Sequence, residues 1–329
     1  MRSFALWYCN KKGSEQPDKE VTVHINLWDK QEDSHKKYCF DFGILVENLK
    51  GIESIYLYVP FVVKKENVKD LGSVISNNQL VNAIFNEDFT TTEGEPKRLI
   101  VNGANQKEKF VIYSLEIESQ VDFNNCKRSV PTPGTILEIK VGSIEPNNIY
   151  RYYFRVRIDV DCSQVYLIND EIKGKSIFSN KFTNTEVIDF RLNDIRSCSE
   201  ELREQFDKGK KFRIKVIHYL ILRNANDEII HYGKPITSRM LENDLWKTYI
   251  EGKNHNIIAY HIKSKAEKVY NHETKSFEID NYINDFSDLT RFQYQKGNWT
   301  VLIKYIIGIV GLGAIGGVIG NLISSLIGL

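Results

Sequence analysis

The chain has 329 residues, of which 42% are hydrophobic and 26% charged, a balance that provides an apolar core and excludes an intrinsically disordered protein. Its 44 lysines and arginines nearly cancel its 43 aspartates and glutamates. The net charge therefore excludes a general affinity for nucleic acid, and any anion site has to be local. The five cysteines form neither a CxxC pair nor an even set, which indicates reduced thiols in a reducing compartment.

Strand-length segments with alternating or continuous apolar residues dominate the first half of the chain. They span residues 21–27, 38–46, 54–63, 99–101, 110–117 and 135–141. Between them, Leu80, Val81, Ile84 and Phe85 recur at helical spacing and predict a helix. The segment 131–134 (Pro-Thr-Pro-Gly) is unsuited to a strand ladder, so we place a linker there and a β-rich soluble domain at 1–130. One elongated sandwich is the alternative.

The second half continues the strand pattern, with candidate strands at 150–160, 163–168, 187–192, 212–222, 228–232 and 256–263. A helix is expected after Ser199, with acidic residues in its first turn and Gly209 as a stop signal. A third helix is expected between Met240 and Tyr249. We assign 135–300 to a second β-rich domain with helices, the candidate sensor. The fold class is therefore mainly β, with sandwich-like or barrel-like soluble domains, a few helices and one C-terminal transmembrane helix.

Two predicted strands carry basic residues on a single face, because side chains alternate along a strand. One face of the first contains Arg151, Tyr153, Arg155 and Arg157, and one face of the second contains Lys211, Arg213 and Lys215. Arginines can hold phosphates through paired hydrogen bonds, and an exposed tyrosine can stack on a base, so these seven residues are the candidate ligand-binding site. The alternative is a solvated strand face whose charges discourage edge-to-edge association.

No motif indicates catalysis. The segment 173–176 (Lys-Gly-Lys-Ser) resembles the end of a phosphate-binding loop, but Asn169 stands where that loop requires glycine. HExxH, GxSxG and GxGxxG motifs are absent, and the seven histidines have no metal-ligand spacing, so we expect them on the surface or in packing contacts. We expect no enzyme activity, no cofactor and no metal site.

The last 25 residues, 305–329, contain no charged side chain and predict a transmembrane helix over 301–329. As a helix they would reach roughly 37 Å, enough for a hydrocarbon core of about 30 Å. Arg291, Lys296 and Lys304 precede this segment, and no basic residue follows it. We therefore expect a tail-anchored, single-pass protein of the cell inner membrane, with its soluble part in the cytoplasm.

Small and polar residues gather on one side of this predicted helix, when successive residues are placed about 100° apart. That face contains Gly313, Gly317, Gly320, Asn321, Ser324 and Gly328. Small residues four apart let helix backbones approach in lipid, and polar side chains there seek a partner helix or a water-filled lumen. We expect a homo-oligomer in the bilayer and a pore lined by this face. An inert tether and a tail stored until a trigger releases it are the alternatives.

The Gly-rich tail from Gly308 to Gly328, the basic strands and the absence of catalytic motifs together resemble the membrane effectors of bacterial antiphage systems. In this class a cytosolic sensor domain controls a transmembrane part. A β-rich sensor with a C-terminal span resembles, in its layout, the channel effector of the Hailong system. The resemblance implies a nucleotide or oligonucleotide ligand, such as oligodeoxyadenylate, made by a partner nucleotidyltransferase, and a channel whose opening harms the host cell. The alternative function is that of a tail-anchored protein-interaction module without channel activity.

Overall fold

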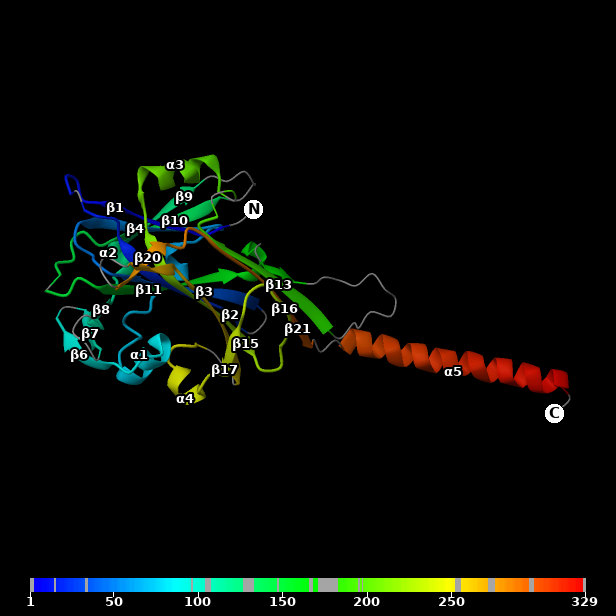
Figure 1. Cartoon of the computed structure of the whole chain (residues 1–329). Coiled ribbons are helices and arrows are strands. Elements are labelled where there is room, and N and C mark those ends of the chain that lie inside the picture. The colour runs from blue at the N-terminus through cyan, green and yellow to red at the C-terminus, as the bar shows by residue number, and fades with distance from the viewer. Residues whose placement is uncertain are drawn as a thin grey trace.

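The computed structural model describes residues 3–14, 16–32, 35–95, 97–103, 108–126, 133–146, 148–165, 168–170, 183–194, 196, 198–251, 256–271, 276–295 and 299–327. They form a body of β-sheets from which one long helix, α5 (Trp299–Ile327), projects away (Figure 1). The prediction of a mainly β fold with few helices and one C-terminal helix long enough to cross a membrane is confirmed.

The largest sheet has ten strands and carries the candidate site. Its order is β17 (Thr237–Met240), β18 (Ile257–Lys265), β15 (Arg213–Asn224), β2 (Glu20–Glu32), β3 (His35–Val46), β11 (Tyr152–Asp161), β8 (Phe110–Tyr113), β7 (Arg98–Asn102) and β6 (Thr90–Gly94), and β5 (Val68–Asp70) also pairs with β11. The centre is a long antiparallel pair of β2 and β3, to which β15 adds in parallel and β11 in antiparallel orientation.

The described residues form three further sheets. A five-stranded sheet runs β14 (Lys210–Lys211), β1 (Ala5–Asn10), β4 (Ile52–Val59), β10 (Gly134–Lys140) and β9 (Val121–Cys126). A four-stranded sheet runs β12 (Ile168–Asp170), β13 (Thr183–Leu192), β21 (Phe286–Gln295) and β16 (Glu228–Tyr232), and β19 (Glu267–Asn271) pairs with β20 (Ser276–Asn281). Since β21 is the last strand before α5, the four-stranded sheet is the part of the body next to the helix (Figure 1).

Strands from both sides of the predicted domain boundary pair with one another. In the ten-stranded sheet β3 pairs with β11 and β2 with β15, and in the five-stranded sheet β4 pairs with β10. Separate β-rich domains at 1–130 and 135–300 therefore do not describe this arrangement, because the strands of both segments build the same sheets. Of the predicted linker, residues 131 and 132 lie outside the described residues, and Gly134 already begins β10.

The two faces of the ten-stranded sheet differ in character, because successive side chains of a strand point to opposite faces. In β2, Val21, Val23 and Ile25 enter the main apolar core, which lies between this sheet and the others. The alternate residues His24 and Asn26 point to the opposite face, which has its own apolar cluster. One strand thus carries an apolar core face and a polar face that is also buried.

Short helices cover parts of the body. α1 (Asn78–Phe85) begins where the Asn77 side chain accepts a hydrogen bond from the backbone N–H of Leu80, and α3 (Glu200–Lys208) begins with the same bond from Leu202 to Ser199. Both were predicted. The third predicted helix is wrong in extent, because α4 covers only Asn243–Trp246. A further short helix, α2, spans Ile117–Gln120. The predicted strand at 163–168 is also wrong, since the chain makes a short 3-10 turn at Cys162–Gln164 before β12.

Candidate functional site

A cavity of about 510 Å³ opens on the polar face of the ten-stranded sheet. Strands β2, β11, β15, β17 and β18 contribute its floor, while α1 and α4 contribute the walls. Its polar lining consists mostly of basic side chains, namely His24, Arg155, His218, Arg239, His261 and Lys263, and its apolar lining includes Phe85 and Trp246. A cavity of this size is in the range of small-molecule sites.

Strand register places four of these basic side chains in one row across five strands. Lys263 of β18 is paired with His218 of β15, which is paired with His24 of β2. His24 is paired with Gly43 of β3, and Gly43 with Arg155 of β11. Because neighbouring strands lie about 4.8 Å apart, the row spans roughly 19 Å, from the exposed Lys263 at the rim to the buried Arg155.

The glycine in this row makes room for a hydrogen-bonded relay. A side chain at Gly43 would meet the Tyr153 hydroxyl, which lies only 2.1 Å from the position of a Cβ there. In that space Arg155 Nη1 donates to the Tyr153 oxygen at 2.6 Å, and the same oxygen lies 3.1 Å from Nδ1 of His24. Within the described residues the Tyr153 hydroxyl has no other acceptor, so its proton goes to His24 Nδ1, and neutral His24 carries its own proton on Nε2.

Arg155 is a buried cation whose charge has no carboxylate partner within the described residues. Its side chain is 1% exposed. Besides Tyr153 it contacts the side-chain amide of Asn26, whose oxygen accepts from Nη2 at 2.7 Å in the amide orientation that satisfies both neighbours of that group. It also lies against the ring of Tyr249, whose centroid is 5.1 Å from the guanidinium carbon. These partners are neutral, and Nε of Arg155 has no hydrogen-bond partner in the described part of the chain. The Asp41 carboxylate acts on its charge through space but does not pair with it directly. A bound anion would do so, because a buried charge without a counter-charge is costly.

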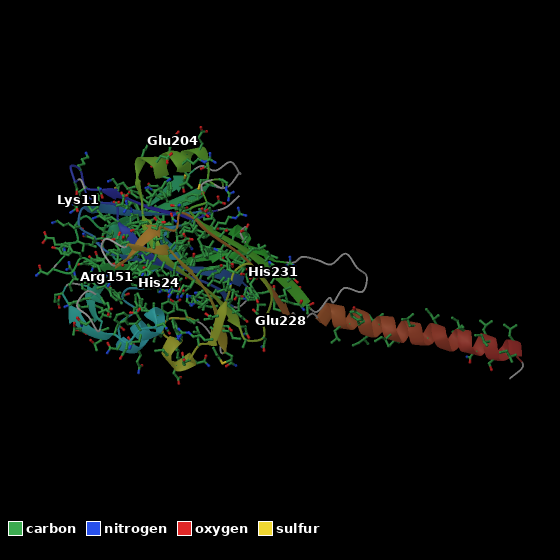
Figure 2. The ribbon with its side chains drawn as sticks, in the orientation of Figure 1. Lys11, His24, Arg151, Glu204, Glu228 and His231 are labelled. Atoms are coloured by element: carbon green, nitrogen blue, oxygen red, sulfur yellow. The ribbon has the colours of Figure 1, made fainter. Side chains whose placement is uncertain are left out.

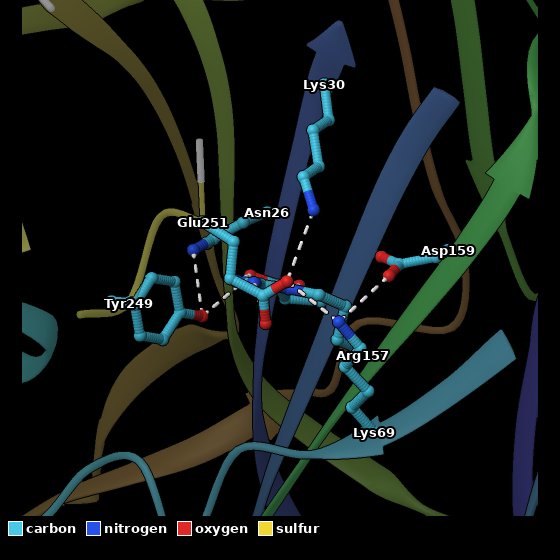
Figure 3. Close-up of polar contacts among 8 residues, drawn as sticks. Asn26, Lys30, Lys69, Arg157, Asp159, Tyr249 and Glu251 are labelled. Atoms are coloured by element: carbon cyan, nitrogen blue, oxygen red, sulfur yellow. Dashed lines mark hydrogen bonds and ion pairs between the residues drawn. The ribbon is translucent and has the colours of Figure 1, made fainter. Parts of the chain in front are cut away.

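The neighbouring Arg157, unlike Arg155, is paired with a carboxylate and so provides a comparison within the same strand. Its Nε and Nη2 donate to both carboxylate oxygens of Asp41 at 2.7 and 3.0 Å, and both side chains are buried. Tyr249 donates to the same carboxylate at 2.7 Å, while Glu251 joins Lys30 and Lys69 at the open side of the cluster (Figure 3). Asp41 therefore binds Arg157 and Tyr249 directly and acts on Arg155 only through space.

The three histidines of the cavity are neutral. Burial, with the neighbouring His218 and the cation of Arg155, holds the pKa of His24 well below its ordinary value. Burial, together with Lys263, lowers the pKa of His218 to about 3, and burial with the same lysine also lowers the pKa of His261. His218 Nδ1 lies 3.0 Å from His261 Nε2, so the two rings share a hydrogen bond. At neutral pH the cavity thus presents N–H groups beside the cations of Arg155, Arg239 and Lys263.

The predicted basic strips are only partly where the sequence pattern suggested. The expectation of an exposed cationic face on residues 150–157 is wrong, because Tyr153, Arg155 and Arg157 are buried within the sheet. β11 is an interior strand between β3 and β8, and the cavity walls cover its face. Arg155 nevertheless lines the cavity, with Tyr153 behind it.

The other four candidate residues lie away from the cavity lining and pair with neighbours. Arg151 and Lys215 contact opposite oxygens of Glu47 at 2.7 and 2.6 Å, so the two strips meet at one carboxylate. Arg213 pairs with Asp18 at 3.0 Å, and the Lys211 ammonium lies 5.1 Å from the ring centroid of Phe206. Each basic side chain of the second strip is therefore paired with a carboxylate or packed on an aromatic ring. His24, His218, His261, Arg239 and Lys263 were not predicted as site residues.

The C-terminal helix is the second candidate working part. Tyr305–Ile327 is 23 residues long and apolar enough to cross a membrane, and none of it is buried against the body. Figure 2 shows its side chains extending on all sides, beyond the end of the body that carries Glu228 and His231. The predicted face includes Gly313, Gly317, Gly320, Asn321 and Ser324, all exposed, whereas Gly328 lies outside the described residues.

Within the described ranges no group of three histidine, cysteine or acidic side chains is placed to hold a metal ion. The sequence matches no known family profile, and none of the curated proteins is similar to it in sequence. The chemistry of the cavity and of the tail therefore has to be argued from their own residues.

Proposed function

We propose that this chain is a single-pass membrane protein in which the β body senses an anionic ligand, a nucleotide or oligonucleotide, and thereby controls a homo-oligomeric pore formed by α5. The observation that carries the proposal is the buried Arg155, which lies without a carboxylate partner among the described residues at the floor of an open, basic cavity. A structural arginine would be expected to resemble Arg157, with its own acid. Arg155 instead has no acid of its own among the described residues, and a bound anion would pair with it directly.

The lining of the cavity supports a phosphorylated ligand with an aromatic part. Arginine and imidazole N–H groups bind phosphate oxygens well. Phe85 and Trp246 contribute flat apolar surface beside them, and the indole N–H of Trp246 has no hydrogen-bond partner in the described part of the chain. A base could stack on these rings while its phosphates meet Arg155 and the histidines. A nucleotidyltransferase encoded nearby would be the expected source of such a ligand.

The tail supports the membrane half of the proposal. An exposed apolar helix of 23 residues, about 35 Å long, requires a bilayer or partner helices around it. The basic residues before it favour an inner-membrane protein with a cytoplasmic body. Close approach of copies through Gly313 and Gly317 would place Asn321 and Ser324 toward a shared axis, where polar groups in lipid are most easily satisfied. Regulated opening of such a pore would suit an antiphage or cell-death effector.

Paired glycine substitutions test the pore. Gly313→Leu with Gly317→Leu should abolish self-association in detergent, measured by light scattering after size exclusion, and dye release from reconstituted vesicles. Gly308→Leu with Gly311→Leu is the matched control, because these glycines lie on the opposite, lipid-facing side and the same bulk is added there. Equal dye release by the two double variants would refute a pore built on the glycine face.

A tail-anchored interaction module is the second candidate, favoured by an exposed apolar patch on the β19–β20 hairpin. Val269, Tyr270 and Phe277 are 53%, 41% and 68% exposed, and the ring centroids of Tyr270 and Phe277 lie 5.2 Å apart. Replacing 305–327 by an unrelated transmembrane segment separates the two functions. A module that only needs to be held at the membrane keeps its activity after the exchange, whereas a pore loses it.

A further inference from the structure

The bond between His218 and His261 has a chemical consequence for ligand binding. Two neutral imidazoles that share one hydrogen bond contain two protons for four nitrogens. One proton lies in the bond between His218 Nδ1 and His261 Nε2, which are 3.0 Å apart. Of the two outer nitrogens, one is therefore protonated and one is bare. A single added proton makes both outer nitrogens donors and gives the pair a positive charge.

The ligand-free cavity opposes that added proton. Apart from one carboxylate, the charged and titratable groups around the pair are basic: Lys263 and Lys265 from β18, Arg239 from β17, His24 from β2 and Arg155 from β11, with Glu87 after α1 as the exception. Burial and these cations keep both histidines neutral. An anion in the cavity reverses this balance, since an opposite charge within about 4–6 Å raises a histidine pKa by roughly 1–3 units.

We propose that the cavity binds a tetrahedral oxyanion, a phosphate or phosphate ester, at Arg155 and His24, and that the His218–His261 pair takes up a proton from solvent as the anion binds. The relay through Tyr153 supports the first half, because it turns the Nε2 proton of His24 into a fixed donor beside the Arg155 cation. The register of β2 and β15 supports the second, because it places His218 directly beside His24, with ring centroids 4.8 Å apart. The proposal rests on the proposed function, since it names the charge chemistry of the same site.

Proton uptake couples affinity to pH in a definite direction. If the complex holds one more proton than the free protein, lowering the pH favours the complex, by at most tenfold per pH unit for one proton. In the free protein His218 is neutral at pH 5, because its pKa is about 3, and the pKa of His261 is lowered as well. With a bound anion that raises the pKa of His218 by about 2–3, the affinity should rise about two- to tenfold between pH 7 and pH 5.

Isothermal titration calorimetry of the full chain in detergent micelles, with sodium sulfate as the probe, tests the coupling. Sulfate is tetrahedral, and its charge stays constant over this pH range. At pH 5 the binding heat should differ between two buffers of different ionisation enthalpy, which measures protons taken up per sulfate. His218→Gln with His261→Gln should remove the rise in affinity toward acid, whereas His231→Gln, outside the cavity on β16, should leave it unchanged.

The outcomes distinguish this inference from the proposed function. Sulfate binding that is independent of pH and of buffer would overturn the proton uptake and leave an anion site. Failure of sulfate to bind at any pH would overturn the anion site as well, and with it the ligand half of the proposed function. A pH-dependent affinity that persists in the double glutamine variant would show that other groups take up the proton, which also refutes the inference.

Discussion

The same substitution to methionine at two positions of β11 should lower the stability at one position and the affinity for an anion at the other. Arg157→Met leaves Asp41 buried with only Tyr249 to donate to it, and breaking a buried ion pair by removing one partner costs about 3–5 kcal/mol. Arg155→Met removes a buried cation that has no carboxylate partner in the described part of the chain. The two arginines are two residues apart on one strand and face, so they form a matched pair.

The magnitude for Arg155 follows from its contacts. Its hydrogen bonds to Tyr153 and Asn26 are worth about 1 kcal/mol each, and its contact with the Tyr249 ring adds about 1 kcal/mol. Against this, the variant avoids the desolvation of a buried guanidinium, which costs several kcal/mol. We expect Arg155→Met to change the free energy of unfolding by less than about 1.5 kcal/mol. Its affinity for an anion should fall roughly ten- to a hundredfold, because a charge-assisted hydrogen bond contributes about 1.5–3 kcal/mol.

Urea unfolding of the full chain in detergent micelles measures the stability difference through tryptophan fluorescence, with Trp28 over Arg157 and Trp246 in the cavity wall as reporters. Sulfate titration of each folded variant measures the affinity. A loss of stability for Arg155→Met as large as that for Arg157→Met would refute the assignment of Arg155 as a ligand anchor. It would place both arginines in the same structural role.

Two further changes test the cavity. Because the pKa of His218 is about 3 in the folded protein against 6.5 in a free histidine, the unfolded chain binds more protons between these values. The free energy of unfolding of the ligand-free protein should therefore fall as the pH drops below 6.5, by up to about 1.4 kcal/mol per pH unit for this histidine. Urea titrations at pH 7, 6 and 5 measure this fall. A stability that stays constant over this range would contradict a neutral buried histidine. Gly43→Ala should displace Tyr153, lower the free energy of unfolding by about 1–3 kcal/mol and weaken sulfate binding. Gly233→Ala is the control and should change little, because its new methyl group would meet nothing closer than 3.5 Å. Equal effects of the two variants would contradict the close approach at Gly43.

The strand pattern of the sequence was sufficient for most of the fold. Alternation in 21–27 and 38–46 predicts the central strands β2 and β3, because their apolar residues at every second position fill one core. The missed strands are mostly short or exposed, as in β17 and β20, where packing on neighbouring strands decides the conformation rather than local preference. β21 was missed although it is long, since Asp288, Thr290 and Arg291 interrupt its apolar pattern.

The candidate site was harder to predict, because its residues meet only through long-range pairing. Alternation correctly placed Tyr153, Arg155 and Arg157 on one face, but a basic face reads as solvent-exposed unless the elements that cover it are known. His24 and His218 become neighbours through the parallel pairing of β2 with β15, which no local signal specifies. The available signal was the pair of polar positions His24 and Asn26, which alternate with apolar residues in β2 and indicate a polar face.

Native mass spectrometry of the full chain, released from detergent micelles, measures subunit number and bound ligand in one spectrum and tests the central claim most directly. The wild-type protein should appear as a homo-oligomer heavier than its subunits by the mass of a phosphorylated ligand, and Arg155→Met should lack that added mass. A monomer without added mass, or a ligand retained equally by Arg155→Met, would contradict a sensor whose cavity controls an assembled membrane helix.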